Sequence, residues 1–79
     1  MALKRPLQPM PPDIHVRLEI AQMRDAYNAR PAYQRNDYLA WIGRAKREAT
    51  REKRIVQMLD ELAGGTTYMK LPWTGAAKG

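Results

Sequence analysis

The stretch that decides the fold is Asp37–Leu62, with the sequence DYLAWIGRAKREATREKRIVQMLDEL. Apolar side chains in its first half recur at the i, i+3, i+4, i+7 spacing of one buried helix face. They are Tyr38, Trp41, Ile42 and Ala45, with Leu39 beside them. The second half repeats the spacing in Ile55, Met58, Leu59 and Leu62. We therefore predict one helix from about residues 34–36 and another from about Arg47 or Glu48 to Ala63, where Gly64 and Gly65 provide a C-terminal cap.

Another helical region is predicted upstream, between two proline-containing segments. Asp13 follows two prolines and is expected to be the N-cap, because its carboxylate can accept amide hydrogens of the first turn. Pro31 disfavours helical geometry at Arg30 and should end the region. The apolar residues fall on two lines along the helix. One consists of Ile14, Leu18 and Ala21, and the other consists of Val16, Ile20, Met23 and Tyr27. Two lines predict either a wide buried face or a bend near residues 21–24.

The flanking segments differ from this helical part in composition. Residues 1–12 contain four prolines, which prevent helix formation, and we expect a flexible arm there. Residues 66–71 have some strand character but are too few for an expected strand, and no partner hairpin is signalled. Residues 66–79 are thus predicted to be an extended tail, disordered at its end. Its apolar residues Tyr68, Leu71 and Trp73 either pack on the helices, which we favour, or remain available to a partner.

The predicted fold is an all-α, small three- or four-helix bundle over residues 13–65, with a flexible N-terminal arm and an extended C-terminal tail. A chain of 79 residues is enough for one small domain and a modest core. It has no signal peptide pattern and no run of 18 apolar residues. We therefore expect a cytoplasmic protein without a transmembrane segment, and we favour a monomer.

Catalytic and metal-binding chemistry finds no support in the composition. The chain has no cysteine, no serine and a single histidine, His15, which is expected to be a partly covered helix residue. Nucleophile–base pairs, paired acid–base carboxylates and zinc sites all lack their usual residues. We predict a protein that is not an enzyme and needs no cofactor or metal.

The chain is basic, with a formal charge of +6, and its densest charge lies in residues 44–54, where six basic residues accompany two acidic ones. Arg51 lies one turn before Ile55 on the apolar stripe, so we expect it to point partly inward and to pair with Asp37 or Asp13. Thr50 is expected to cap or back-bond locally at the same turn. The candidates for partner contact are Arg44, Lys46, Arg47, Lys53 and Arg54. Arg47 and Arg54 share one side of the helix, where they face either a polyanion or only solvent.

Several paired residues of this stretch resemble a known family. The pairs are Asp37-Tyr38, Trp41-Ile42, Ala45-Lys46, Thr50-Arg51 and Arg54-Ile55, followed by Leu62 and Gly65. Their spacing is similar to that of the YdeI or OmpD-associated (OmdA) bacteriocin-protection family, over about residues 13–65. The proline common before Thr-Arg in that family is replaced by Glu48 and Ala49, and Arg30 stands where an apolar residue is expected. The motif of residues 37–55 is otherwise intact.

The resemblance implies a helical interaction module linked to stress or bacteriocin resistance, and it carries no general chemistry with it. We therefore expect a protein partner, with the basic corner between the second and third helical regions as the contact surface. The alternative is a nucleic-acid-binding protein that contacts phosphates through the same corner. Against that alternative, the first two turns of the last helix lack Asn or Gln, and Glu48 and Glu52 would repel phosphate.

Overall fold

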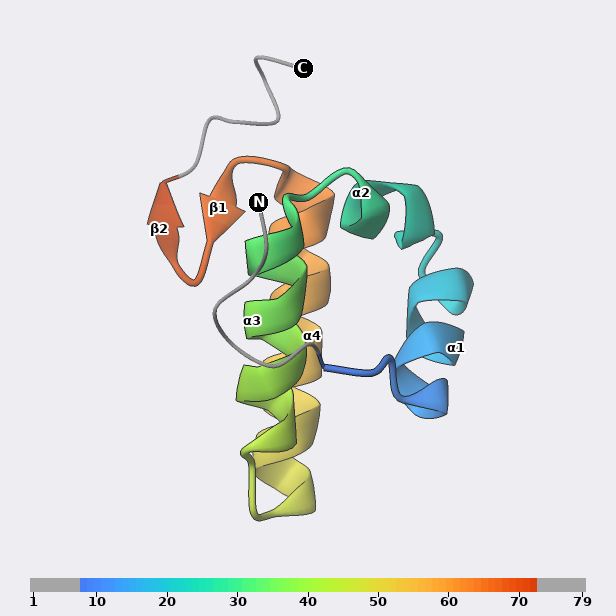
Figure 1. The fold of residues 1–79 in the computed structure, drawn as a ribbon, viewed down its shortest axis with the longest axis vertical. Coiled ribbons are helices and arrows are strands. Elements are labelled where there is room, and N and C mark those ends of the chain that lie inside the picture. Colours follow the sequence, from blue (N-terminus) through green and yellow to red (C-terminus); the bar gives the residue numbers. More distant parts are fainter. Residues whose placement is uncertain (1–7, 73–79) are drawn as a thin grey trace.

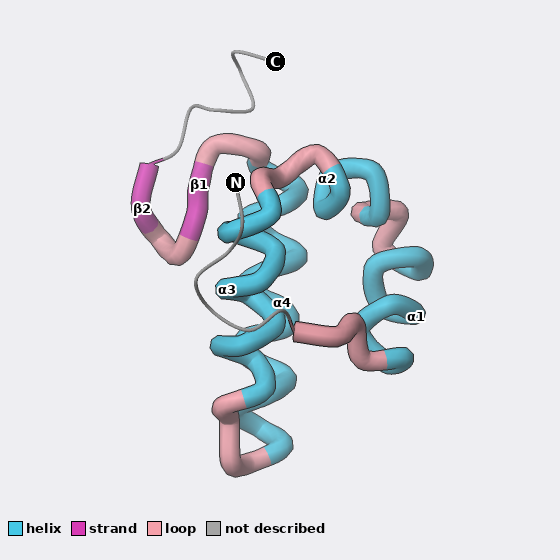
Figure 2. The backbone as a smooth tube through the Cα atoms, viewed as in Figure 1, coloured by secondary structure: helices cyan, strands magenta, loops and turns pink. Residues whose placement is uncertain are grey.

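The computed structural model describes residues 8–72, which form four helices and a small hairpin (Figure 1). The helices are α1 Pro12–Ile20, α2 Arg24–Asn28, α3 Ala32–Gly43 and α4 Glu48–Gly64. The strands are β1 Thr67–Tyr68 and β2 Leu71–Pro72. Figure 2 shows that helices dominate the described chain and that the strands are confined to its C-terminal end. The prediction of a small helical bundle is confirmed.

Helices α3 and α4 lie side by side and antiparallel, and α1 and α2 cover one side of this pair (Figure 1). The buried apolar core comes from all four helices and consists of Ile14, Leu18, Tyr27, Tyr38, Leu39, Ile42, Ile55, Met58 and Leu62. Trp41 and Leu59 are only partly buried and pack against this core. The apolar faces predicted within residues 37–62 therefore do face the core, and Trp41 lies at the edge of that core.

The starts of two helices follow proline more closely than predicted. Helix α1 begins at Pro12, so Asp13 lies inside the first turn and is not the N-cap. Helix α3 begins at Ala32, directly after Pro31, and not at residues 34–36. Pro12 suits the first position of α1 because its φ is already helical and the missing N–H would have no partner there, whereas Pro31 precedes α3 as its N-cap. The Asp13 carboxylate is consequently available for a contact with another helix.

Of the two alternatives predicted for the upstream helical region, a wide buried face or a bend, the structure has the bend. Gln22 has a positive φ of 58° between α1 and α2 and breaks the helix there. Ile14 and Leu18 are fully buried, whereas Val16 and Ile20 are 49% and 75% exposed. The expectation of a second buried line is therefore wrong for Val16 and Ile20, because α1 buries only one narrow face.

The arm and the tail are more ordered than predicted over the part that the structure describes. The Gln8 amide donates to Asn36 Oδ1 at 2.7 Å, and Met10 packs against the core, so residues 8–12 are docked. The predictions for residues 1–7 and for Trp73 to Gly79 lie outside the described residues. Between residues 8 and 72, no helix has the length and apolar character needed to cross a membrane.

The tail forms an antiparallel hairpin, which the sequence did not signal. Tyr68 pairs with Leu71, and the turn residues Met69 and Lys70 have φ values of 51° and 65°. Two positive φ values in a two-residue turn match the right-handed twist of the strands, but they usually occur in Asn-Gly or similar pairs. Tyr68 packs against the core as expected, whereas Leu71 is 63% exposed.

Candidate interaction site

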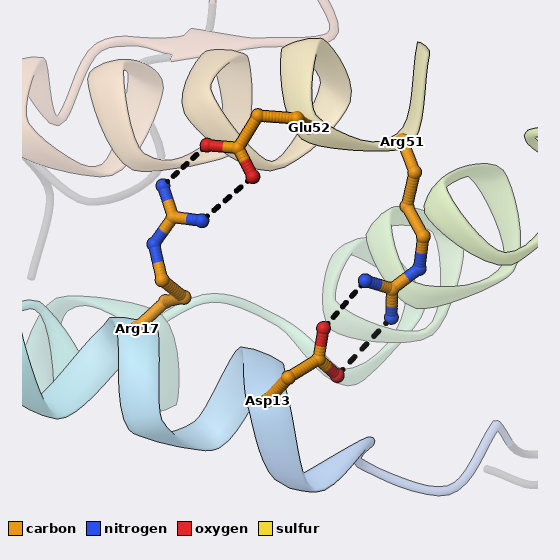
Figure 3. Close-up of polar contacts among 4 residues, drawn as sticks. All are labelled: Asp13, Arg17, Arg51 and Glu52. Carbon is orange, nitrogen blue, oxygen red and sulfur yellow. Dashed lines mark hydrogen bonds and ion pairs between the residues drawn. The ribbon is translucent and has the colours of Figure 1, made fainter. Parts of the chain in front are cut away.

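Two ion pairs join α1 to the first turns of α4 (Figure 3). Arg51 donates from both terminal nitrogens to the Asp13 carboxylate, and the longer of these bonds is 3.2 Å. Arg17 donates likewise to Glu52 at 2.8 Å on both oxygens. Hydrogen bonding from Arg51 lowers the pKa of Asp13, and that from Arg17 lowers the pKa of Glu52. Of the two partners predicted for Arg51, the structure pairs it with Asp13.

Asp37, the other predicted partner of Arg51, instead holds the hairpin. It accepts a hydrogen bond from the Tyr68 hydroxyl. The Tyr68 ring contacts Tyr33 and Tyr38 edge to face, with centroids 5.9 and 5.6 Å away. The acidic residue that opens the sequence motif is thus part of the contact between α3 and the tail.

Thr50 lies half-buried in the first turn of α4, where a hydroxyl cap was expected. Arg47 occupies the N-cap position, and the helix has no side-chain cap. The Thr50 hydroxyl forms no hydrogen bond with another described residue, so it does not fulfil the predicted capping role.

Arg54 differs from the other predicted contact residues because its side chain binds the end of α3. Its guanidinium donates to the Trp41 carbonyl oxygen at 2.6 Å and lies over the indole ring, 5.2 Å from the centroid. It thus gives a second donor to one of the last carbonyl groups of α3, which also accepts the Arg44 amide at 3.3 Å, and it shields the edge of the core. Its predicted sharing of a solvent-facing side with Arg47 is wrong, since Arg54 is half-buried and Arg47 is exposed.

The remaining candidates are exposed at the turn between α3 and α4 or one turn beyond it. They are Arg44, Lys46, Arg47 and Lys53, named here the corner cations. None of them forms a salt bridge with a residue between 8 and 72. The turn projects at the end of the α3–α4 pair that is farthest from the hairpin (Figure 1). Glu48 is exposed in the same region, while Glu52 is occupied by Arg17.

A buried polar network at the opposite end of α3 and α4 was missed by the sequence reasoning. Arg30 donates to Gln34 Oε1 at 3.1 Å and to the Glu61 carbonyl oxygen at 2.9 Å. The Glu61 carboxylate accepts the Tyr38 hydroxyl, Gln57 Nε2 and the amides of Met69 and Lys70. Burial, and then hydrogen bonding to Glu61, raises the pKa of the Tyr38 hydroxyl.

One indication of this network was present in the sequence, namely two polar residues at positions that are expected to be apolar. Glu61 lies beside Leu62 on the buried side of α4, and Arg30 stands where the family pattern expects an apolar residue. Both are polar residues at positions where apolar ones are expected, and they belong to the same buried hydrogen-bond network. Within residues 8–72, no cluster of three or more histidine, cysteine or acidic side chains could hold a metal ion.

Comparison with known proteins identifies a family over most of the chain. The family model described as bacteriocin-protection, YdeI or OmpD-associated (OmdA) matches residues 9–65. This range runs from the docked arm through the C-terminal cap of α4 and excludes the hairpin. No curated protein and no solved structure matches the chain.

Proposed function

The chain belongs to the bacteriocin-protection, YdeI or OmpD-associated family, and on this premise we propose that it is a non-enzymatic interaction module that binds an acidic protein surface through its corner cations. We further propose that this binding contributes to bacteriocin protection. The observation that carries the proposal is the division of the positive charges into two groups.

One group of arginines is occupied within the fold. Each of these side chains donates a hydrogen bond to a carboxylate, an amide oxygen or a carbonyl oxygen. They are Arg17, Arg24, Arg30, Arg35, Arg51 and Arg54. The corner cations have no such bond to a described residue, so their charge is available to a partner.

The position of the corner cations also favours a partner contact. Three of them lie within four residues at a projecting turn, where neither the hairpin nor α1 covers them (Figure 1). Clustered charges of one sign raise the rate of encounter with an oppositely charged surface. A contact built on exposed charges also weakens as salt is added. Moderate, salt-dependent binding is therefore expected.

The alternative function is nucleic-acid binding through the same cations. The ion pair with Arg17 removes one of the two acidic groups that would repel phosphate, because Glu52 is already neutralised. The first two turns of α4 still carry no Asn or Gln that would read base edges. Such binding would be limited to phosphates and would not depend on sequence.

A binding assay at several salt concentrations tests both functions with defined probes. The probes are a poly-glutamate peptide, a random-sequence DNA duplex and single-stranded DNA, each starting at about 50 mM salt. We expect saturable binding of poly-glutamate that weakens steeply with salt. A variant with all four corner cations changed to glutamine should bind about tenfold or more weakly. The Arg24→Gln variant, which removes a cation of α2 that is paired with Glu19, is the single-charge control and should change binding little.

The outcomes separate the two functions. Tight, salt-sensitive binding of DNA without binding of poly-glutamate would replace the interaction module with the nucleic-acid alternative. Absence of binding to every probe at low salt, or equal losses in the corner variant and the Arg24→Gln control, would refute the corner as a contact surface.

A further inference from the structure

A cavity of about 230 Å³ lies between the N-terminal arm, α2 and α3. It is separate from the corner cations, none of which lines it. Met10 and Leu39 supply apolar walls, and Tyr27 and Arg35 supply polar groups. This combination of apolar surface and a few polar groups is typical of small-molecule sites.

The arm forms one wall of this cavity and is held in place by a specific bond. The Gln8 amide donates to Oδ1 of Asn36, a residue that is itself buried in α3. Met10 follows two residues later and packs against the core. The wall is therefore fixed in the folded chain, and no rearrangement of residues 8–12 is needed to create the cavity.

Tyr27 lines the cavity, and its hydroxyl forms no hydrogen bond with a residue between 8 and 72. The residue is only 5% exposed, but its hydroxyl oxygen is not among the fully buried polar atoms that lack a partner, so it is accessible from outside. An accessible hydroxyl can donate a hydrogen bond to a ligand in place of water. Burial raises the pKa of Tyr27, with a smaller opposing effect from Arg35, so the hydroxyl is a neutral donor.

Arg35 lines the same cavity and is oriented by the backbone. Its Nε donates to the Arg30 carbonyl oxygen at 3.0 Å. Its two terminal nitrogens form no hydrogen bond with a described residue. A guanidinium fixed at Nε presents these nitrogens as a planar fork, which matches the two oxygens of a carboxylate.

We propose that this cavity binds a small monocarboxylate with an apolar body. The carboxylate accepts hydrogen bonds from Arg35 and Tyr27, and the apolar body lies against Met10 and Leu39. The cavity is smaller than the roughly 300–1,000 Å³ of sites for drug-sized ligands. A single aromatic ring or a short aliphatic chain is therefore the appropriate size. The inference does not depend on the function of the corner cations.

Nuclear magnetic resonance titration of the ¹⁵N-labelled chain tests this site with benzoate as the probe. Benzyl alcohol is the matched neutral probe, because it keeps the ring and lacks the carboxylate. We expect saturable shifts for benzoate at the amides of Tyr27, Arg35 and Leu39, with millimolar affinity, and about tenfold weaker binding of benzyl alcohol.

Two variants distinguish a binding role from a structural one. Tyr27→Phe removes a hydroxyl that forms no hydrogen bond within the described residues, so the thermal midpoint should not fall, but benzoate should bind several-fold more weakly. Arg35→Lys keeps the charge, loses the fork, and should also weaken benzoate binding. Arg47→Gln at the corner is the control and should leave benzoate binding unchanged.

Three results would overturn the proposal. The first is equal binding of benzoate and benzyl alcohol, which would remove the carboxylate from recognition. The second is benzoate affinity unchanged in both Tyr27→Phe and Arg35→Lys. The third is a set of shifts confined to the corner, abolished by Arg47→Gln, which would show only anion binding by exposed cations.

Discussion

Arg51 and Asp13, 38 residues apart, form a two-point ion pair that links α1 to the first turn of α4 (Figure 3). The neighbouring pair of Arg17 and Glu52 has the opposite polarity, with the cation on α1 and the anion on α4. An exchange of partners would place Asp13 against Glu52 and Arg17 against Arg51. Like charges would then face each other, so the two pairs together favour one position of α1.

Replacing Arg51 with alanine should destabilise the fold more than replacing Arg47. The Arg51 side chain is 26% exposed, and its partner Asp13 is 56% exposed, so water screens the pair. We expect Arg51→Ala to lower the free energy of unfolding by about 1 kcal/mol. Arg47→Ala should change it by less than about 0.5 kcal/mol. Urea unfolding followed by circular dichroism measures both, and equal, negligible effects would contradict the architectural role of Arg51.

The contribution of this pair should disappear in acid. Arg51 lowers the pKa of Asp13 below its ordinary value of 3.8, so the carboxylate ionises more readily in the folded chain than in the unfolded chain. The resulting stabilisation is complete above pH 3.8 and is lost as pH falls through the lower folded value. The stability difference between the wild type and Arg51→Gln, from urea unfolding at pH 7 and well below pH 3.8, should therefore close in acid. A difference that persists at the lowest pH would assign the effect to packing of the arginine stem.

Glu61→Gln should loosen the hairpin as well as destabilise the bundle. The carboxylate accepts four hydrogen bonds, two of them from the hairpin amides of Met69 and Lys70, and an amide side chain has only one oxygen. We expect a loss of about 2–3 kcal/mol in the free energy of unfolding. The amides of Met69 and Lys70 should also exchange faster with deuterium.

The neighbouring Asp60→Asn is the control for Glu61→Gln, because Asp60 is exposed and makes none of these bonds. It should leave both stability and hairpin exchange near the wild-type values. Unchanged protection of Met69 and Lys70 in Glu61→Gln would mean that Glu61 does not hold the turn.

Gly65→Ala and Gly64→Ala should have effects of opposite sign. Gly65 caps α4 with a φ of 77°, a conformation in which a Cβ costs about 1 kcal/mol. Gly64 is the last helical residue, and alanine there should be neutral or stabilising by up to about 1 kcal/mol. A Cβ at either position would meet no atom within 4 Å, so backbone conformation alone decides the difference. Thermal unfolding measures both, and destabilisation of equal size would contradict this explanation.

The sequence by itself determined the helical architecture and its two longest elements. The spacing of Ile55, Met58 and Leu62 and the glycine after the last helical turn are local features. They specify a helix, its buried face and its end without reference to other elements, so α3, α4 and the bend between α1 and α2 could be predicted. Arg51 could also be assigned an inward role, because its position relative to the stripe is fixed by helical periodicity.

Only the tertiary structure decided which polar groups meet. Asp13 rather than Asp37 binds Arg51, Arg54 turns to the end of α3, and Glu61 holds a hairpin whose turn lacks the usual residues. Each choice depends on the distance between helices that are far apart in sequence, and periodicity gives a residue's direction on its own helix only. The burial of Arg30, Gln34 and Glu61 has the same origin, since a polar group enters a core only where another element supplies its hydrogen bonds.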